Sequence, residues 1–319
     1  MKINKKKILI TGGAGFIGYH IVNALLNQEA DVTILLQPYE KTWRLELIKN
    51  KINIVKDSLV NQEGIRSLIK KTSPEVIIHL AGLMERRRDL SILEELHKYH
   101  VIGTINLLRS IDKKTTKLII NTGTSEEYGE QVDPFLETMA TDPVSPYSAT
   151  KAATTAIAIY LSKATGVPIV TMRPFIIYGP FQLHDTLIPF LIKCALQKKM
   201  IDLTEGLQYR DFLYVTDLVS CYLSVIEKAE SIMGHEILNV GSGHPTKIHD
   251  VIKTLAGQLD AHDLLRIGAR KMRAGETPSM IADIKKAKEL IGWQPKVTLE
   301  EGLRATIDWW RKNERFWKG

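Results

Sequence analysis

The sequence contains little cysteine, and this shortage excludes several classes of protein. Only 2 of its 319 residues are cysteines, Cys194 and Cys221, too few for a disulfide-stapled scaffold or a cysteine metal cage. Two thiols outside any framework are typical of a reducing compartment, so we expect a cytoplasmic protein with both thiols in its core. The 9 histidines show no ligand spacing such as H-E-x-x-H, and no metal site is predicted.

Long apolar runs and a secretory leader are also missing. No apolar stretch approaches the roughly 20 residues of a membrane-spanning helix, and we expect no membrane partner. The basic N-terminus precedes an apolar stretch that ends at Thr11-Gly12-Gly13, which is too short for a signal peptide. The net charge of +7 would suit a nucleic-acid binder or an enzyme of phosphorylated substrates. Because no recognition motif or aromatic-rich basic groove accompanies the charge, we expect no nucleic-acid partner.

Short apolar runs alternate with amphipathic stretches along the first half of the chain. A helix is predicted at 16–28, and strands are predicted at 7–10, 31–36, 52–55, 76–80, 117–120 and 168–172. Such near-continuous Val, Ile and Leu strands between helices indicate a parallel sheet covered on both faces. The alternation of strand-like and helical segments becomes less regular after Arg173, although strand-like pieces recur at 211–215 and 236–240. We therefore expect one domain at 1–172, rejoined by about 210–240, and a second mainly at 173–319.

A glycine-rich loop follows the first predicted strand. Gly12, Gly15 and Gly18 lie between that strand and the helix that begins at Phe16. Glycine there permits a tight turn and close approach of a pyrophosphate, which the first helical N–H groups, around Phe16 and Ile17, would bind. A dinucleotide loop is favoured over a merely structural turn because of its strand-and-helix setting. The predicted fold class is α/β, a Rossmann-type doubly wound parallel sheet with a smaller α/β C-terminal domain.

The carboxylate that usually binds the adenosine ribose is missing from the end of the second strand. That strand ends in Leu36-Gln37, where an acidic residue is usual. Lys41 and Arg44 follow and would suit the 2′-phosphate of NADP, although solvated helix charges explain them equally well. We expect NADP rather than NAD, with Gln37 and Arg44 among the cofactor contacts.

Tyr147 and Lys151 lie four residues apart at the start of a predicted helix. They share one helix face, so the ammonium group is expected to stabilise the tyrosinate and lower the phenol pKa from its usual value near 10. A phenol tuned in this way exchanges a proton with a substrate oxygen. After a dinucleotide loop, the pair indicates a catalytic site more than a packed tyrosine and a solvated lysine.

With these motifs the chain resembles the extended short-chain dehydrogenase/reductase family, specifically its nucleotide-sugar epimerases, dehydratases and 4-ketoreductases. The resemblance covers essentially the whole chain. Its further matches are Asp57, His79 to Gly82, Gly103-Thr104, Thr124 to Gly129, Arg173-Pro174, Tyr178 to Pro180, Arg210 to Phe212, Asp217, Asn239 to Gly243 and Gly292 to Pro295. It implies an NAD(P)-dependent enzyme whose C-terminal domain binds a nucleotide-sugar, and a homodimer through the helices around 94–110 and 147–164.

The resemblance also implies roles for individual residues. Thr124 completes a catalytic set with Tyr147 and Lys151, and Lys151 also holds the nicotinamide ribose. The other cofactor contacts that it implies are Asp57, Leu59, Leu80, Ala81 and Gly82. The substrate contacts that it implies are Met84, Thr124 and two arginines on the diphosphate, Arg210 and Arg273. A bidentate guanidinium suits a diphosphate, although either arginine would also fit a surface ion pair.

The segment Thr124-Ser125-Glu126-Glu127 leaves the reaction open among three. Dehydratases of the family carry an acid and a glutamate base after the hydroxyl residue, and this triplet is similar to that of GDP-mannose 4,6-dehydratases. A similar segment with two glutamates occurs in 4-ketoreductases, whereas epimerases commonly carry small residues there. A ketoreductase consumes cofactor, which cells usually supply as NADPH. The missing ribose carboxylate therefore favours reduction of an NDP-4-keto-6-deoxyhexose at C4, with Tyr147 as the proton donor.

The alternatives are an NDP-hexose 4,6-dehydratase, with Glu126 as the base, and an NDP-sugar 4-epimerase. A non-catalytic NADP-binding sensor or scaffold has no need of the proton-transfer set. The chain also departs from the family at two asparagines, which are Ile176 and His100 here. Three arginines at 86–88 border the expected sugar pocket, where they would either contact phosphate or face water. These departures bear mainly on substrate identity.

Overall fold

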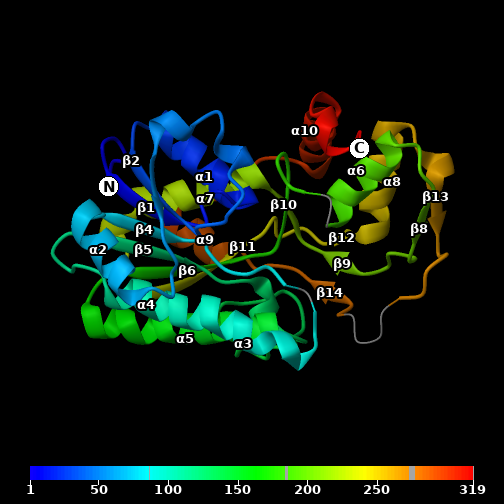
Figure 1. Cartoon of the computed structure of the whole chain (residues 1–319). Helices are drawn as coiled ribbons and strands as arrows, with labels where there is room; N and C mark the ends of the chain where they lie inside the picture. The colour runs from blue at the N-terminus through cyan, green and yellow to red at the C-terminus, as the bar shows by residue number, and fades with distance from the viewer. Residues whose placement is uncertain (86, 184–185, 273–276, 319) are drawn as a thin grey trace.

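A computed structural model describes residues 1–85, 87–183, 186–272 and 277–318 of the chain (Figure 1). Seven parallel strands form its central sheet, in the spatial order β11-β6-β5-β4-β1-β2-β3. Their bounds are β1 Lys7–Thr11, β2 Asp31–Leu36, β3 Asn53–Lys56, β4 Val76–His79, β5 Leu118–Thr122, β6 Ile169–Pro174 and β11 His235–Val240. The order of the first six strands is that of a Rossmann-type sheet, which confirms the predicted fold class.

Helices cover both faces of the sheet (Figure 1). Successive residues of β1 explain this, because Ile8 and Ile10 pack into the apolar cluster of one face and Leu9 into that of the other. Burying such a side chain contributes about 1.5–3 kcal/mol. The first face carries α1 Phe16–Asn27, α7 Val215–Glu227 and α9 Lys285–Ile291. The second carries α2 Gln62–Thr72, α3 Leu93–Leu96, α4 Gly103–Arg109 and α5 Pro146–Thr165.

The elements that follow β6 are shorter. Apart from β11, the strands described there form three small sheets, in which β10 pairs with β7, β9 lies between β12 and β14, and β13 pairs with β8. These strands are β7 Ile176–Tyr178, β8 Ile201–Leu203, β9 Tyr209–Arg210, β10 Phe212–Tyr214, β12 Thr246–Lys247, β13 Leu265–Ile267 and β14 Ser279–Met280. Their helices are α6 Leu187–Leu196, α8 Ile248–Leu259 and α10 Leu299–Lys312. β11 returns the chain to the main sheet beside β6, and the two-domain division stays our proposal.

Two buried carboxylates hold these short elements together through backbone N–H groups. Asp211 is 0% exposed and Asp217 is 4% exposed. The donors to Asp211 are the N–H groups of Ser242, Gly243 and Ala282, at 2.5, 3.0 and 3.2 Å. The donors to Asp217 are those of Lys296 and Val297, both at 2.9 Å. Segments far apart in the chain are thus joined at two acidic side chains.

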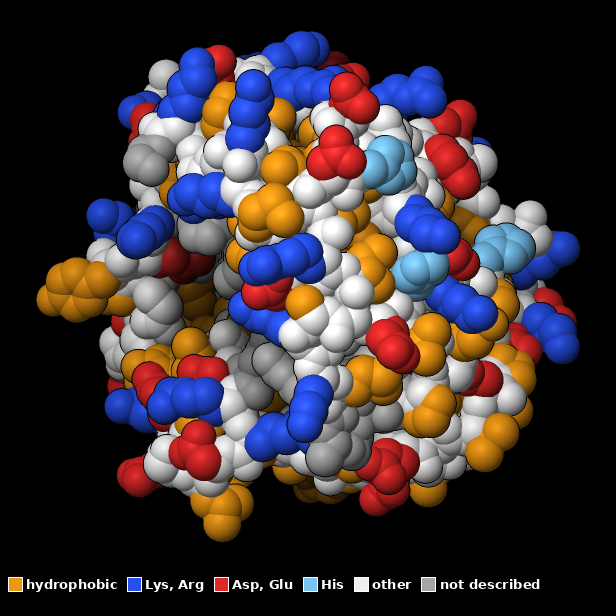
Figure 2. Space-filling view, turned by 90° about the vertical axis from the view of Figure 1, so that its right-hand side faces the viewer, with side chains coloured by type: hydrophobic (Ala, Val, Ile, Leu, Met, Phe, Trp, Pro, Cys, Tyr) orange, Lys and Arg blue, Asp and Glu red, His pale blue; other side chains and the backbone are white. Residues whose placement is uncertain are grey.

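The face on the side of the C-terminal elements carries charges of both signs (Figure 2). Lys and Arg side chains are interspersed there with Asp, Glu and hydrophobic side chains. Within the described ranges, no helix combines the length and apolar character needed to cross a lipid bilayer. Positive and negative side chains are thus mixed on this face.

Candidate active site

The glycine-rich loop joins β1 to α1 at the carboxyl edge of the sheet. Gly12 has a φ of +73°, and a Cβ there would lie 2.8 Å from the backbone nitrogen of Ala81. A Cβ on Gly18 would lie 2.2 Å from the Gly12 carbonyl oxygen. Gly15 caps α1 without any side-chain hydrogen bond, so the N–H groups of the first turn have no side-chain cap. The residues of that turn include Phe16, Ile17 and Gly18. This cradle fits a dinucleotide pyrophosphate.

A carboxylate lies just beyond the end of β2, although the strand itself ends without one. The backbone N–H of Gln37 donates to Glu40 Oε2 at 3.2 Å. Burial raises the pKa of Glu40, against the opposing effects of this hydrogen bond and of the Arg44 charge. Arg44 donates to the carbonyl oxygens of Phe181 and Ala14, at 3.0 and 3.3 Å. Arg44 thus lies next to the glycine loop, and Glu40 lies close enough to Arg44 to feel its charge.

The remaining predicted cofactor residues follow β3 and β4. Asp57 and Leu59 come directly after β3, and Leu59 is 4% exposed. Residues 80–82 follow β4, where the Ala81 N–H donates to Thr11 Oγ1 at 3.1 Å. All of them lie at the carboxyl edge of the sheet, where open α/β sheets bind ligands. Their contact with a cofactor stays a prediction.

The start of α5 is fixed by its capping residues. The Ser148 N–H donates to Ser145 Oγ at 3.1 Å, and the Ser145 N–H donates to Ser148 Oγ at 3.0 Å. Pro146 occupies the first turn, where its missing N–H costs no helical hydrogen bond. Tyr147 and Lys151 therefore lie one turn apart on one face of α5. Each is 7% exposed.

Thr124 lies at the turn that follows β5. Its Oγ1 accepts a hydrogen bond from the Glu126 N–H at 3.3 Å and so caps the 3-10 turn Ser125–Tyr128. Because the oxygen accepts this bond, the hydroxyl proton is available for a substrate oxygen. Lys151 reaches the same strand end, where Nζ donates to the Thr122 carbonyl oxygen at 2.8 Å. The end of β5 therefore brings Thr124 close to Lys151, and Glu126 is exposed on the same turn.

A buried chain of polar side chains links β1 to α5 beside this centre. Thr104 donates to the His100 carbonyl oxygen at 2.5 Å and therefore accepts from His79 Nε2 at 2.9 Å. His79 Nδ1 is then the acceptor for the Thr11 hydroxyl at 2.7 Å. His100 Nδ1 lies 2.8 Å from Thr150 Oγ1. The geometry thus fixes the tautomer of His79.

Burial dominates the electrostatics of the centre. Burial lowers the pKa of Lys151 to about 8, against the opposing charge of Glu127. Burial, and next the Lys151 charge, lower the pKa of His79 to about 3 and that of His100 to about 3. Both histidines are therefore neutral at pH 7. The positive charge one turn from Tyr147 is that of Lys151.

Among the buried residues beside this centre that were not predicted as site residues are Glu127 and His79. Both have a signal in the sequence. His79 is a polar residue that ends an apolar strand, and Glu127 is the second of two adjacent glutamates in a short turn, where neighbours point in different directions. Neither signal predicts which residues the side chain contacts.

The predicted substrate residues lie on several elements. Arg210, in β9, is 8% exposed, and its Nη1 donates to the Tyr209 carbonyl oxygen at 2.7 Å. Met84 follows β4 and is 67% exposed. Ile176, which replaces the family asparagine, is in β7 and 39% exposed. Arg273 lies outside the described residues. The contacts of these residues with substrate stay predictions.

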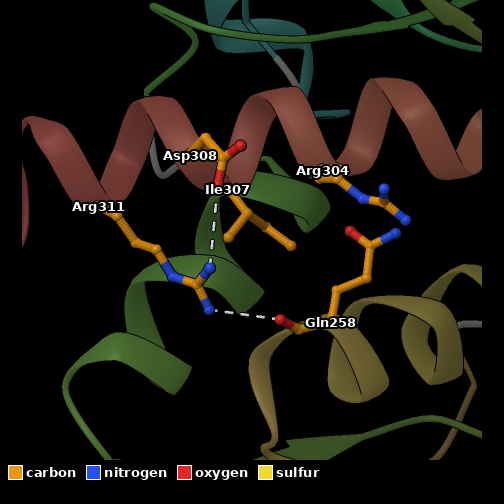
Figure 3. A pocket seen from close by; sticks show the side chains of 5 residues that line it. All are labelled: Gln258, Arg304, Ile307, Asp308 and Arg311. Atoms are coloured by element: carbon orange, nitrogen blue, oxygen red, sulfur yellow. Dashed lines mark hydrogen bonds and ion pairs between the residues drawn. The ribbon is translucent and has the colours of Figure 1, made fainter.

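A hollow elsewhere in the molecule has no part in this centre. It lies between α10 and the end of α8, has a volume of about 290 Å³ and is drawn in Figure 3. Arg311 forms an ion pair with Asp308 at 3.8 Å and donates to the Gln258 carbonyl oxygen at 3.3 Å. None of the predicted site residues lines it.

Comparison with known proteins identifies the family. The family model described as GDP-mannose 4,6 dehydratase matches residues 9–306. The chain belongs to this family. A UDP-glucuronate 4-epimerase of Thermodesulfobacterium geofontis is 30% identical over 96% of this chain and 96% of its own. As the resemblance predicted, the chain is an enzyme of the nucleotide-sugar epimerase and dehydratase group.

Two solved structures of the same group are similar to this one throughout. A dTDP-glucose 4,6-dehydratase from Bacillus anthracis in complex with NAD is 29% identical, with a TM-score of 0.85, and 98% of this chain and 99% of that chain are covered. A UDP-glucose 4-epimerase from Thermotoga maritima with UDP-glucose is 28% identical, with a TM-score of 0.88 and coverage of 96% and 99%. The fold and the nucleotide-sugar group are therefore shared with members that catalyse different reactions.

Proposed function

We propose that this member of the GDP-mannose 4,6-dehydratase family reduces the C4 keto group of an NDP-4-keto-6-deoxyhexose. The observation that carries the proposal is the composition of the turn after β5. Thr124, Tyr147 and Lys151 suffice for proton exchange at one substrate oxygen, whereas loss of water also needs an acid beside Thr124. That position holds Ser125, which is 7% exposed and a weaker acid than a carboxyl group. Because the Thr124-Ser125-Glu126 triplet is also similar to that of GDP-mannose 4,6-dehydratases, dehydration is kept as the second candidate.

Each of the three side chains, Tyr147, Thr124 and Lys151, has its own role in proton transfer during reduction. When bound, a reduced nicotinamide cofactor supplies the hydride for C4. Tyr147 donates the proton to the C4 oxygen. Thr124 donates a hydrogen bond to the same oxygen, because a carbonyl oxygen can only accept, while the Thr124 oxygen itself accepts the Glu126 N–H. Lys151 stabilises the phenolate that Tyr147 becomes, and the burial of all three strengthens these interactions.

A 4,6-dehydratase is the second candidate, and Glu126 favours it. Its exposed carboxylate lies two residues after Thr124 on the capped turn, where a base would remove the proton next to a transient ketone. Reduction leaves Glu126 as a polar wall of the pocket. The two reactions therefore differ in their dependence on this one carboxylate.

A substrate panel distinguishes the candidates. The protein is incubated with NADPH, NADH or NAD⁺ and with GDP-, CDP-, TDP- and UDP-hexoses and their 4-keto-6-deoxy forms. We expect cofactor oxidation with a 4-keto substrate, and Glu126→Gln to keep at least about a third of it. Glu130→Gln, which changes another exposed carboxylate of the same segment, is the matched control. A 4-keto product from a plain nucleotide-sugar without net cofactor change, lost in Glu126→Gln, would contradict reduction, and an inverted C4 would indicate epimerisation.

We also propose NADPH as the cofactor and a cytoplasmic homodimer as the working form. The absence of a carboxylate at Leu36 and the place of Arg44 beside the glycine loop support NADPH. The NAD complex of the B. anthracis dehydratase and the carboxylate of Glu40 favour NAD as the alternative. The free thiols of Cys194 and Cys221 are consistent with a reducing compartment.

A further inference from the structure

Glu127 adjoins the catalytic set, yet no step of the proposed reaction uses it. Its side chain is 0% exposed, enclosed by the turn after β5, by β6 and by α5. Oε1 accepts the Thr124 N–H at 3.0 Å. Oε2 accepts the Thr155 hydroxyl at 2.8 Å and the Nε and Nη2 groups of Arg173 at 3.0 and 2.8 Å. One buried carboxylate thus ties the residue that carries the catalytic hydroxyl to both neighbouring elements.

The surrounding chain is fitted to this carboxylate. A Cβ on Gly123 would lie 2.3 Å from Glu127 Oε1, so glycine is required beside it. The Arg173 guanidinium lies 4.4 Å from the ring centre of Tyr128, the next residue of the turn. Apolar residues of similar volume often stabilise a fold at least as well as a buried ion pair. Stability alone therefore does not account for a charged pair at this place.

The charge of Glu127 also acts on Lys151. Burial lowers the pKa of Lys151, and the negative charge of Glu127 opposes that effect. The two histidines on the neighbouring elements are neutral, and the Arg173 charge is paired with Glu127. The titratable groups around Lys151 are thus Tyr147 on α5, His79 at the end of β4, His100 on the π-helical segment His97–Ile102, Glu127 on the turn and Arg173 on β6.

We propose that the Glu127–Arg173 pair positions the active centre: it fixes the Thr124 hydroxyl toward the substrate oxygen and keeps the Lys151 ammonium group charged. Glu127 and Arg173 act through Thr124 and Lys151 and touch no reacting atom. The effect on turnover rests on the proposed function, whereas the charge of Lys151 is a property of the chain itself. The two parts are therefore measured separately.

Glu127→Gln keeps the shape of the side chain and removes its charge. We expect kcat to fall about 10- to 100-fold, because small displacements of a catalytic group have effects of this size. KM should stay within about threefold, since Glu127 does not contact substrate. Without the Glu127 charge, Lys151 loses its proton at a lower pH, so the alkaline limb of the kcat profile should move to lower pH.

The titration of Lys151 is measured directly by NMR on the full chain labelled with ¹³Cε-lysine. Its signal is identified by its absence from Lys151→Arg. We expect a midpoint near pH 8 in the parent and a lower one in Glu127→Gln. Glu137→Gln is the matched control, because that carboxylate accepts the Asn239 N–H at 2.9 Å and has no contact with Thr124. This measurement needs no substrate. It therefore tests the effect of Glu127 on Lys151 even if the protein does not catalyse the proposed reaction.

The double variant Glu127→Gln/Arg173→Met separates positioning from folding. It leaves no unpaired buried charge, and we expect it to regain the parent melting temperature while keeping the lowered kcat and the lowered Lys151 midpoint. Recovery of both kcat and midpoint in the double variant would overturn the proposal, since only an unpaired arginine would then have caused the loss. Parent values in Glu127→Gln, or an equal loss in Glu137→Gln, would overturn it as well.

Discussion

The sheet half and the C-terminal half of the molecule are held together in different ways. The inner strands of the sheet are near-continuous apolar runs, and burial of their large apolar area stabilises them. The short strands of the other half also bury apolar side chains, such as Ile201 and Leu213, but distant segments there are joined in addition by the carboxylates of Asp211 and Asp217, which accept backbone N–H groups. The proposed chemistry of Tyr147 and Lys151 belongs to the first half, whereas Arg210 adjoins Asp211 in the second. Substrate binding should therefore be the more fragile property.

Tyr147→Phe should have the largest effect of any single change. Removal of the proton donor is expected to lower kcat about 10²- to 10⁴-fold. Binding of NAD(P)H, measured by fluorescence titration, should change less than about twofold, because we expect the glycine loop to bind the cofactor without this hydroxyl. Tyr160→Phe, on the same helix and 68% exposed, should behave as the parent. A kcat of Tyr147→Phe equal to that of the parent would show that Tyr147 is not the proton donor.

Asp211→Ala should destabilise the C-terminal half of the molecule. It leaves three backbone N–H groups without their acceptor, and a loss of about 3 kcal/mol in the free energy of unfolding is expected. Urea denaturation measures it. Because Arg210 precedes Asp211, KM for the nucleotide-sugar should also rise.

The sheet half supplies the comparison for that change. Ile10→Val removes one methyl group from a fully buried side chain and should cost about 0.5–1.5 kcal/mol. A smaller loss in Asp211→Ala than in Ile10→Val would contradict the view that single carboxylates hold the second half.

Acid should destabilise the sheet half through its buried histidines. Burial, and next the Lys151 charge, lower the pKa of His100 from 6.5 to about 3. Below pH 6.5 the unfolded chain binds protons that the folded chain does not, so stability is lost as the pH falls toward 3. At pH 5 the loss in the free energy of unfolding that is due to His100 is about 2 kcal/mol. His100→Asn should therefore lose about 2 kcal/mol less than the parent between pH 7.5 and 5.0, by urea denaturation at both pH values.

The exposed His262, in the other half, provides the control for this pH effect. His262→Asn removes an imidazole at the surface and is measured beside His100→Asn, which removes a buried one. Equal slopes in His100→Asn and the parent would show that the His100 ring takes up its proton in the folded state as easily as in the unfolded one.

The same difference explains which parts of the fold were predictable. The strand at 31–36 and the helix start at Phe16 are where the sequence pattern predicts them, because long apolar runs and a glycine loop are local signals. β9 and β12 have two residues each, too few to show any period. They exist because Asp211 and its neighbours bring distant segments together, which is information that no window of sequence contains.

The candidate site divides in a similar way. Tyr147, Lys151 and Thr124 could be found from spacing and resemblance, since their relation is set by one helix and one strand end. Glu127 could not, because a glutamate in a short polar turn is equally typical of a solvated surface. Its inward direction depends on Gly123 beside it and on Arg173, which arrives from β6. Tertiary contacts of this kind become visible only in the structure.

The smallest expected effects concern the proposed ribose site, where Arg44 and Glu40 carry opposite charges. Arg44→Gln should weaken NADPH binding about fivefold and NADH binding less than about twofold, because only NADPH carries the 2′-phosphate. Glu40→Gln should strengthen NADPH binding by a similar factor, because it removes a negative charge near that phosphate. Fluorescence titration with both cofactors gives the ratio of dissociation constants.

Glu46→Gln controls for charge alone, because that exposed carboxylate lies on the same stretch and pairs with Lys49 at 2.9 Å. The opposite pattern is equally informative. If the parent prefers NADH and Glu40→Gln weakens NADH binding, Glu40 replaces the carboxylate missing at Leu36, four residues after its usual place. The absent strand-end acid would then not indicate NADPH for this chain, and the proposal of reduction would rest on the turn after β5 alone.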